Sequence, residues 1–407
     1  MRLGQEDRGP GRPLPCRAGL DEGWVSYCRR ASTRLKMINT KLCELLAIEH
    51  PIIQAGMGPF GTNRLAIAVA NAGALGLISS SALESKDVSP DGYNQFRKTF
   101  EPGLEVESAA ETLKNIFRHT LKKTQKSKGI FGLNVLVSAE ILQGAGQMIQ
   151  ATIEVREEDP EMKERLKVIV TSAGNPSRWT DIIKPSGVKW LHVVPSVRAA
   201  QKAVEAGCDG VIASGHEGGF HTAWEPVHSM ILLPAVVEAL PDTPVVGAGG
   251  FCDGKTLAAA LVLGGVGIQM GTRFLCTQES DFVEFWKKRI LDAGDRATQV
   301  ARGLVGPARF IKSAYSGEVA EMTAEYSPGV YTGRPDDIAS VSRELLIKEH
   351  EGFMASYADA PDESKALTAG GECAQRISDM PTVQELITRT TEQAKEILET
   401  TPSKVLA

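Results

Sequence analysis

The chain has 407 residues, of which 42% are hydrophobic and 23% charged, a composition that excludes a disordered chain, a collagen-like repeat and a disulfide-stapled miniprotein. Its 45 basic and 50 acidic residues give a formal net charge of -5, which argues against nucleic acid or an anionic membrane as a partner. The seven cysteines are scattered without a CxxC pair, and no apolar run approaches ~18 residues. We therefore expect a cytoplasmic protein with reduced thiols and no membrane span; the sequence leaves a homodimer open.

Residues 1–36 differ from the rest of the chain because they are rich in Arg, Gly and Pro and have no hydrophobic period. We predict a disordered extension here. An organelle transit segment is one alternative, but the acidic residues and the prolines in this stretch are untypical of one. A start of translation at Met37 is another alternative.

From residue 37 onward, short β-branched or aliphatic runs alternate with stretches of helical period, the pattern of βα units around a parallel sheet. The predicted strands cover residues 51–56, 74–80, 130–137, 168–174, 188–196, 210–215, 243–250 and 265–272. Helical patterns follow most of them, for example over residues 63–71, 197–206, 229–240 and 253–263. Eight βα units are what a closed barrel needs, so the sequence predicts an α/β protein with a (β/α)8 TIM barrel over residues 37–294.

An open, doubly wound sheet is the alternative architecture, because periodicity alone does not reveal whether a sheet closes. A dinucleotide fold of that kind would carry GxGxxG after its first strand, whereas the turn here reads QAGMGPFG. Between the second and third strands, residues 105–126 have the pattern of an amphipathic helix. After about residue 294 the βα rhythm stops, and residues 295–407 are predicted to be helices and loops, a helical appendage packed on the barrel.

The loops after strands seven and eight are candidates for a phosphate site, because a parallel barrel binds its ligand at the carboxyl ends of its strands. The seventh strand ends in Gly249 and Gly250, followed by Asp253 as a candidate helix N-cap, and the eighth ends in Gly271 and Thr272. Glycines let main-chain N–H groups approach an anion, a helix N-terminus adds partial positive charge, and Thr272 can donate its hydroxyl. The alternative is that both loops are ordinary strand-ending turns.

The loop after the sixth strand reads SGHEGGFH over residues 214–221 and holds the densest set of chemically active side chains. Its imidazoles, His216 and His221, suit proton transfer near neutral pH. We reject a metal site, because His and Glu at neighbouring loop positions lack a third, distant ligand. Cys252 and Cys276 follow the phosphate loops, but neither has a neighbouring base in the sequence, so covalent catalysis is not indicated.

Taken together, these loops resemble the nitronate monooxygenase family, formerly called 2-nitropropane dioxygenases, which are FMN-containing (β/α)8 barrels. The resemblance is carried by ordered motifs at the ends of most strands. They are HPIIQAGMG (50–58), LAIAVANAGALGLIS (65–79), GLNVLV (132–137), TSAGNP (171–176), HVVPSVRAAQKAVEAGCDGVIASGHEGGFH (192–221), PVVGAGGFCDG (244–254), IQMGTRFLCTQES (268–280) and, more weakly, AGGECAQRISDMPTVQEL (369–386).

The resemblance implies a set of FMN contacts at matching positions of this chain. They are Ala55, Gly56 and Met57 beneath the flavin, Asn134 at its ring system or ribityl chain, Ser214 and Gly215 beside the isoalloxazine, Gly218 and Gly219 along the cofactor, and Gly249, Gly250, Gly271 and Thr272 at the phosphate. The last four coincide with the phosphate site predicted from the residues themselves.

The resemblance also implies a catalytic histidine. In the family the strand-six loop commonly reads Glu-Ala-Gly-Gly-His, and its histidine lies over the flavin as the base or orienting group. Here the string is EGGFH, which assigns this role to His221, with Phe220 in place of a glycine and His216 as a second candidate. The first loop departs as well, with Gly56 where the family usually has proline. Both departures line the expected substrate space.

The implied reaction is oxidation of an alkyl nitronate or nitroalkane by FMN and O2 to a carbonyl compound and nitrite, so the expected partners are a small nitro compound and O2. The nearest rival function is an NAD(P)H-dependent flavin enoyl-acyl-carrier-protein reductase, which shares nearly the same motifs. A non-catalytic flavin-binding barrel and a phosphosugar-binding barrel without flavin are further alternatives.

Overall fold

The computed structural model describes residues 38–58, 62–84, 93–94, 100–138, 142–303, 305–357 and 361–406. The extension predicted for residues 1–36 lies outside the described residues.

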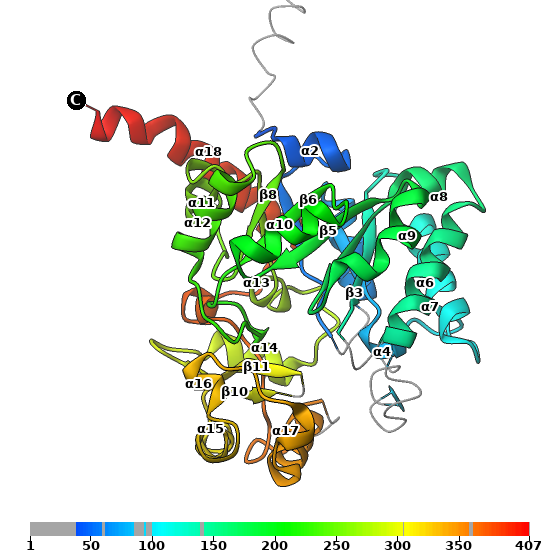
Figure 1. The fold of residues 1–407 in the computed structure, drawn as a ribbon. Coiled ribbons are helices and arrows are strands. Elements are labelled where there is room, and N and C mark those ends of the chain that lie inside the picture. The colour runs from blue at the N-terminus through cyan, green and yellow to red at the C-terminus, as the bar shows by residue number, and fades with distance from the viewer. Residues whose placement is uncertain are drawn as a thin grey trace, which may run out of the picture. The chain divides into compact units, whose positions relative to one another are not determined.

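Within the described residues, eight parallel strands form a closed ring (Figure 1). They are β1 (Ile52–Gln54), β2 (Gly76–Ser79), β3 (Phe131–Leu136), β4 (Leu166–Ser172), β5 (Lys189–Val194), β6 (Gly210–Ser214), β8 (Val245–Ala248) and β9 (Ile268–Met270). They pair in the order β1-β9-β8-β6-β5-β4-β3-β2, and a parallel bridge between Ile53 and Leu75 joins β1 to the residue before β2. The eight predicted strands and the TIM barrel are confirmed, and the open-sheet alternative is wrong.

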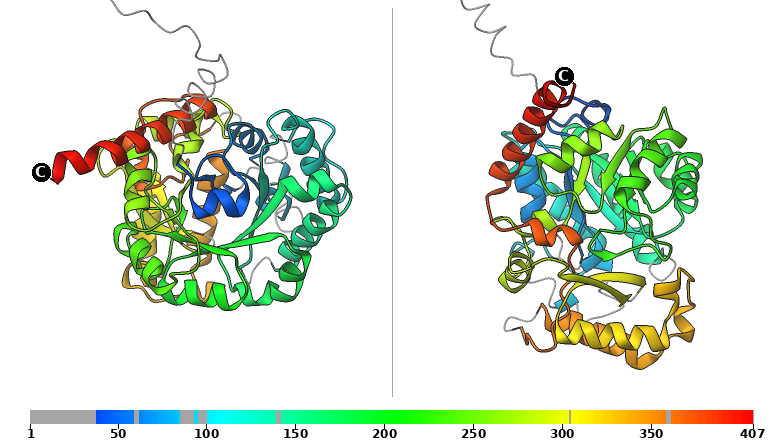
Figure 2. Two further views of the ribbon diagram at one scale, coloured as in Figure 1. Left: turned by 90° about the horizontal axis from the view of Figure 1, so that it is seen from above. Right: turned by 90° about the vertical axis from the view of Figure 1, so that its left-hand side faces the viewer.

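Helices follow the strands and surround the ring, as the view along the barrel in Figure 2 shows. They are α3 (Asn63–Asn71), α4 (Ser81–Glu84), α6 (Ala109–Lys123), α7 (Leu142–Arg156), α8 (Pro160–Arg165), α9 (Thr180–Ile183), α10 (Val197–Glu205), α11 (Ser229–Ala239), α12 (Gly254–Val262), α13 (Thr272–Leu275) and α14 (Glu284–Leu291). The helix α6 lies inside the segment predicted as amphipathic, and it buries Leu113, Ile116 and Phe117. Burial of one stripe explains why this segment shows a helical period.

The inside of the barrel is a cluster of aliphatic side chains from alternate strand positions, because successive residues of a strand face opposite sides of the sheet. Its members include Ile53, Leu77, Val170, Leu191, Ile212 and Val246. The helix α2 (Lys41–Leu46) closes the end at which the strands begin, with Leu42 and Leu46 fully buried against this cluster. Figure 2 shows α2 across the centre of the ring. The end at which the strands finish is therefore the one left for a ligand.

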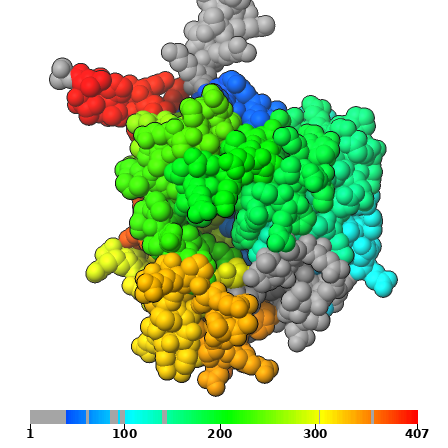
Figure 3. Space-filling model, in the orientation of Figure 1, coloured from blue at the N-terminus to red at the C-terminus, as the bar shows by residue number. Residues whose placement is uncertain are grey.

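The chain after the barrel forms a second small sheet and several helices. The antiparallel strands β10 (Thr298–Gly303) and β11 (Gly306–Ile311) pair with each other, and β11 also pairs with β7 (Phe220–His221) from the strand-six loop. The helices are α15 (Ala314–Tyr326), α16 (Gly329–Thr332), α17 (Arg343–Ala355) and α18 (Val383–Val405). We call residues 298–303 and 305–357 the cap; in Figures 1 and 3 its yellow and orange residues lie against one end of the barrel.

This sheet corrects the prediction that residues 295–407 contain only helices and loops. The two strands carry the arginines Arg302 and Arg309, which are 2% and 5% exposed. Their guanidinium groups pair with carboxylates of Asp336 at 3.1 Å and Glu372 at 3.0 Å. Buried charged residues break the apolar pattern by which a buried strand is recognised in a sequence.

The division of the chain into a barrel and an appendage at residue 294 stays a prediction. No helix among the described residues is long and apolar enough to cross a membrane.

Candidate functional site

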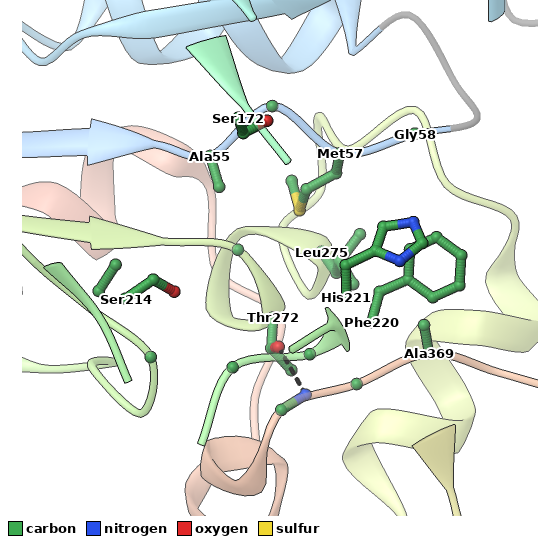
Figure 4. A pocket seen from close by; sticks show the side chains of 18 of the residues that line it. Ala55, Met57, Gly58, Ser172, Ser214, Phe220, His221, Thr272, Leu275 and Ala369 are labelled. Atoms are coloured by element: carbon green, nitrogen blue, oxygen red, sulfur yellow. Dashed lines mark hydrogen bonds between the residues drawn. The ribbon is translucent and has the colours of Figure 1, made fainter. Parts of the chain in front are cut away.

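A cavity of about 430 Å³ lies where the barrel strands end, between the barrel and the cap. This volume is within the range of about 300–1,000 Å³ found for small-molecule sites. Figure 4 shows part of its lining, with Phe220 and His221 side by side and Ser214 on another side. Twelve of the predicted site residues line it: Ala55, Gly56, Met57, Asn134, Ser214, Gly218, Gly219, His221, Gly249, Gly250, Gly271 and Thr272. Gly215 and His216 are not among the described residues of the lining.

The first loop packs directly on the end of β3. A Cβ atom placed on Gly56 would lie 2.2 Å from the Cβ of Asn134, so a larger residue requires this asparagine to move. Asn134 is 6% exposed and Gly56 lies beside it at the cavity wall. The predicted first-loop and Asn134 contacts therefore come together in space, and the glycine is what permits their close approach.

The loops after β6 and β8 also meet main chain to main chain. Gly249 and Gly250 have φ of +84° and +83°, in the left-handed region that favours glycine. A Cβ on Gly249 would lie 2.6 Å from the carbonyl oxygen of Gly215. The hydroxyl of Ser229 donates a hydrogen bond to the carbonyl oxygen of Gly249 at 2.7 Å, next to this contact. This places Gly215 behind the β8 loop rather than at the cavity, and its substitution would disturb the site through Gly249.

The N-terminus of α12 is satisfied by the protein's own groups. Asp253 caps it, as the sequence predicts, and the structure adds a reciprocal capping box with Thr256. The amide N–H of Gly254 donates to Oε1 of Gln393 in α18 at 2.9 Å. The amide N–H groups of Gly254 and Thr256 are thus engaged within the protein, and the contribution of this helix end to a phosphate site stays a prediction.

The C-terminal segment supplies lining residues that sequence reasoning did not assign to the site. Ala369, Gly370 and Gly371 border the cavity, and the Gly371 N–H donates to Oγ1 of Thr272 at 3.0 Å (Figure 4). A Cβ on Gly219 would lie 2.6 Å from the Gly371 nitrogen, so the Gly218–Gly219 pair packs tightly against the Gly370–Gly371 pair. The signal that could have found them is the Gly-Gly pair within the weak C-terminal motif.

His221 lies in the cavity wall on β7. Burial, with a smaller contribution from the charge of Arg302, lowers its pKa to about 4, so the imidazole is neutral at pH 7. Its Nδ1 atom is buried without a hydrogen-bond partner among the described residues. Pairing of β7 with β11 holds the residue, with His221 opposite Ala308. A neutral imidazole at this position offers a lone pair to a bound molecule, and the burial that keeps it neutral also disfavours its protonated form.

His216 occupies a different environment behind the loop. Its carbonyl oxygen accepts hydrogen bonds from Nε and Nη2 of Arg309 at 3.3 and 2.9 Å. Its ring lies edge-on to His228, with 5.5 Å between the centroids. Burial and the neighbouring charges of Arg309 and His228 lower its pKa to about 4. Of the two predicted histidines, only His221 is brought to the cavity.

The two cysteines weighed as nucleophiles are buried. Burial raises the pKa of Cys276 to about 12, so its thiol is protonated at neutral pH. The pKa of Cys252 is lowered by a hydrogen bond with the thiol of Cys373, but only Cys373 of these three lines the cavity. Within the part of the chain that the structure describes, no three His, Cys, Asp or Glu side chains converge as a metal site requires.

Comparison with protein families decides the kinship of this chain. The family model described as nitronate monooxygenase matches residues 39–393. The chain belongs to the nitronate monooxygenase family. Family membership makes it an oxidoreductase of a flavin-dependent class, as the sequence motifs predicted.

The proteins that are similar to this chain carry the names of different activities. A dehydrogenase of a hydroxy-methyl-oxo-octahydroindene carboxyl-CoA from Rhodococcus jostii is 34% identical over 272 residues, which is 67% of this chain and 65% of that protein. A probable nitronate monooxygenase of Staphylococcus aureus is 28% identical over 305 residues, 69% of this chain and 82% of that one. The structure of FabK from Thermotoga maritima has 27% identity and a TM-score of 0.71, and covers 90% of this chain and 100% of that chain. This chain thus spans slightly under two thirds of the Rhodococcus relative.

The residues present fit the flavin that the family implies. The rim loops are rich in glycine. A Cβ on Gly218 would fit in ordinary van der Waals contact, with the Gly215 oxygen 3.4 Å away, so the missing side chain leaves that volume to the cavity. A Cβ on Gly271 would likewise come no nearer than 3.4 Å, to Sδ of Met57. No Lys or Arg occurs among the described lining residues. A phosphate would therefore depend on main-chain N–H groups and the Thr272 hydroxyl, which matches the predicted donors.

Proposed function

We propose that this family member binds FMN in the cavity and oxidises alkyl nitronates or nitroalkanes with O2 to a carbonyl compound and nitrite. The phosphate would lie on Gly249, Gly250, Gly271 and Thr272, and the ring system beside Met57 and the Gly218–Gly219 pair. Bound FMN would supply the electron transfer and the reaction with O2. The observation that carries the proposal is a neutral imidazole, His221, in the wall of a glycine-rimmed cavity at the strand ends.

The chain's own groups have separate tasks in this reaction. His221 would take the α-proton from a neutral nitroalkane, a step that a preformed nitronate does not need. The Thr272 oxygen accepts a hydrogen bond from the Gly371 N–H, and its hydroxyl also interacts with the Cys373 thiol. With FMN bound, this hydroxyl would donate its proton to the phosphate instead. The apolar residues of the cap would exclude water from the reacting carbon.

Reduction of an enoyl thioester by NAD(P)H is the second candidate. One observation favours it: Val305, Phe353 and Met354 of the cap turn apolar side chains to the cavity, where an acyl chain could lie. The Rhodococcus relative, whose name gives a CoA ester as its substrate, supports a thioester in the same way.

Anaerobic mixing of the purified yellow protein with propane-2-nitronate and, separately, with NADPH distinguishes these candidates. We expect the nitronate to bleach the flavin absorbance and NADPH to leave it unchanged. Bleaching by NADPH alone would transfer the assignment to the reductase, and bleaching by neither would support a non-catalytic flavin-binding barrel. A colourless protein that cannot be loaded with FMN would contradict the flavin itself.

A further inference from the structure

Phe220 has a backbone conformation that is unusual for a bulky residue. Its φ is +59°, in the left-handed region where a Cβ atom is unfavourable. The family commonly has glycine at this position, which would adopt that conformation without strain. A strained residue in a cavity wall persists only where its surroundings hold it, and it points to a function for the side chain.

The Phe220 ring is held by aromatic neighbours from the cap. It stacks on Phe353 of α17 with 5.0 Å between the centroids and an angle of 5°. It meets Phe310 of β11 edge-on at 6.1 Å, and its centroid lies 4.1 Å from that of His221. These contacts fix the ring next to the imidazole.

The aromatic surface continues beyond Phe220. Trp286 of α14 lies edge-on to Phe353 at 6.1 Å, and Phe282 lies 5.1 Å from Trp286. Phe220, Phe282, Trp286 and Phe353 all line the cavity, and we call them the aromatic wall. Phe282 and Trp286 are 3% and 2% exposed, so both rings are packed into the protein.

The charges around the cavity disfavour an acidic substrate. Among the described lining residues the ionisable groups are Glu217, Glu349, His221, His350 and the Cys373 thiol, and none is a Lys or Arg. A carboxylate on the substrate would enter beside two acidic side chains, without a Lys or Arg in the described lining to pair with, which disfavours its binding. An uncharged apolar group would instead bind favourably, because its contact with the apolar lining removes both surfaces from water.

We propose that the aromatic wall binds an uncharged, ring-sized apolar body of the substrate, so that the enzyme prefers aryl-bearing nitro compounds to short or carboxylate-bearing ones. The identity of the reacting nitro group rests on the proposed function; the preference for the apolar body rests on the wall alone. Phe220 is then a specificity-determining residue, because a body packed on its ring is held beside His221.

Anaerobic calorimetric titration of the FMN-loaded protein tests this preference by equilibrium binding. The probes are (2-nitroethyl)benzene, which is neutral and aromatic, and 3-nitropropionate, which carries a carboxylate. We expect the aromatic probe to bind the wild type at least about tenfold more tightly, and Phe220→Gly to remove about tenfold of that affinity while leaving 3-nitropropionate unchanged. Glycine suits the φ at this position, and Phe353→Leu is a second variant should the first fail to fold. Phe117→Leu, in a stacked pair of the barrel core away from the cavity, is the matched control and should keep the preference.

Equal affinity for the two probes, tighter binding of 3-nitropropionate, or an unchanged preference in both wall variants would overturn the inference. Nitrite release under air separates this outcome from failure of the proposed function. The expected binding preference without nitrite from either probe would refute nitronate oxidation and leave the wall's role standing. Nitrite release from both probes, bound with equal affinities, would support nitronate oxidation and refute the role of the aromatic wall.

Discussion

Replacement of Gly249 by alanine is the sharpest perturbation of the proposed phosphate loop. Its φ of +84° makes any Cβ unfavourable by about 1–2 kcal/mol. The added methyl group would also lie 2.6 Å from the Gly215 oxygen, a main-chain atom that cannot rotate away. Overpacking of this kind costs about 1–3 kcal/mol, so we expect Gly249→Ala to destabilise the protein by about 2–5 kcal/mol.

Gly187→Ala is the matched control for this variant. Gly187 has φ of +67°, but a Cβ there meets nothing within 4 Å, so this change carries the backbone strain alone. Urea denaturation followed by circular dichroism gives the stability of each variant, and quenching of flavin fluorescence on titration of the apoprotein gives FMN affinity. We expect Gly187→Ala to lose about 1–2 kcal/mol and keep its FMN affinity. Equal stability and equal FMN affinity of the two variants would refute the proposed packing of the β6 and β8 loops.

Three further predictions concern the strand-six loop. His221→Asn should abolish nitrite formation from neutral nitroalkanes, keep it for preformed nitronates and leave FMN bound; loss with both substrates would contradict a role in proton removal. Because its pKa is lowered to about 4, His221 stays neutral well below the ordinary histidine value, so kcat/KM of the wild type for nitroalkanes should fall only as the pH drops through about 4. An acid limb of this profile near pH 6.5 would argue against His221 as the base. Arg309→Met removes the donor to the His216 oxygen and should cost about 2–3 kcal/mol in a denaturation titration, with a raised KM, whereas Arg296→Met, at an exposed ion pair, should change neither.

The barrel could be predicted from the sequence because each of its strands is a short aliphatic run buried on both faces. No local pattern reveals ring closure: the sequence predicts it only through the count of eight βα units, and the structure shows it in the bridge between Ile53 and Leu75. The capping of α12 was also predictable, because Asp253 and Thr256 carry the whole motif within four residues.

The site could be predicted only as far as local loops define it. Twelve of fourteen predicted site residues line the cavity, because strand ends of a parallel barrel meet at one rim. The choice between His216 and His221 depends on the pairing of the two-residue strand β7 with β11, about ninety positions away in the chain. Gly370, Gly371 and the aromatic residues Phe282, Trp286 and Phe353 reach the cavity only through tertiary packing, which no local pattern records.

The most direct test of the account is a crystal structure of the purified yellow protein with its cofactor bound. The account predicts one FMN in the cavity, its phosphate within hydrogen-bonding distance of the Gly249–Gly250 loop and the Thr272 hydroxyl, and its ring system beside Met57 and His221. A flavin bound elsewhere, or a phosphate held by arginine or lysine side chains away from these loops, would contradict it.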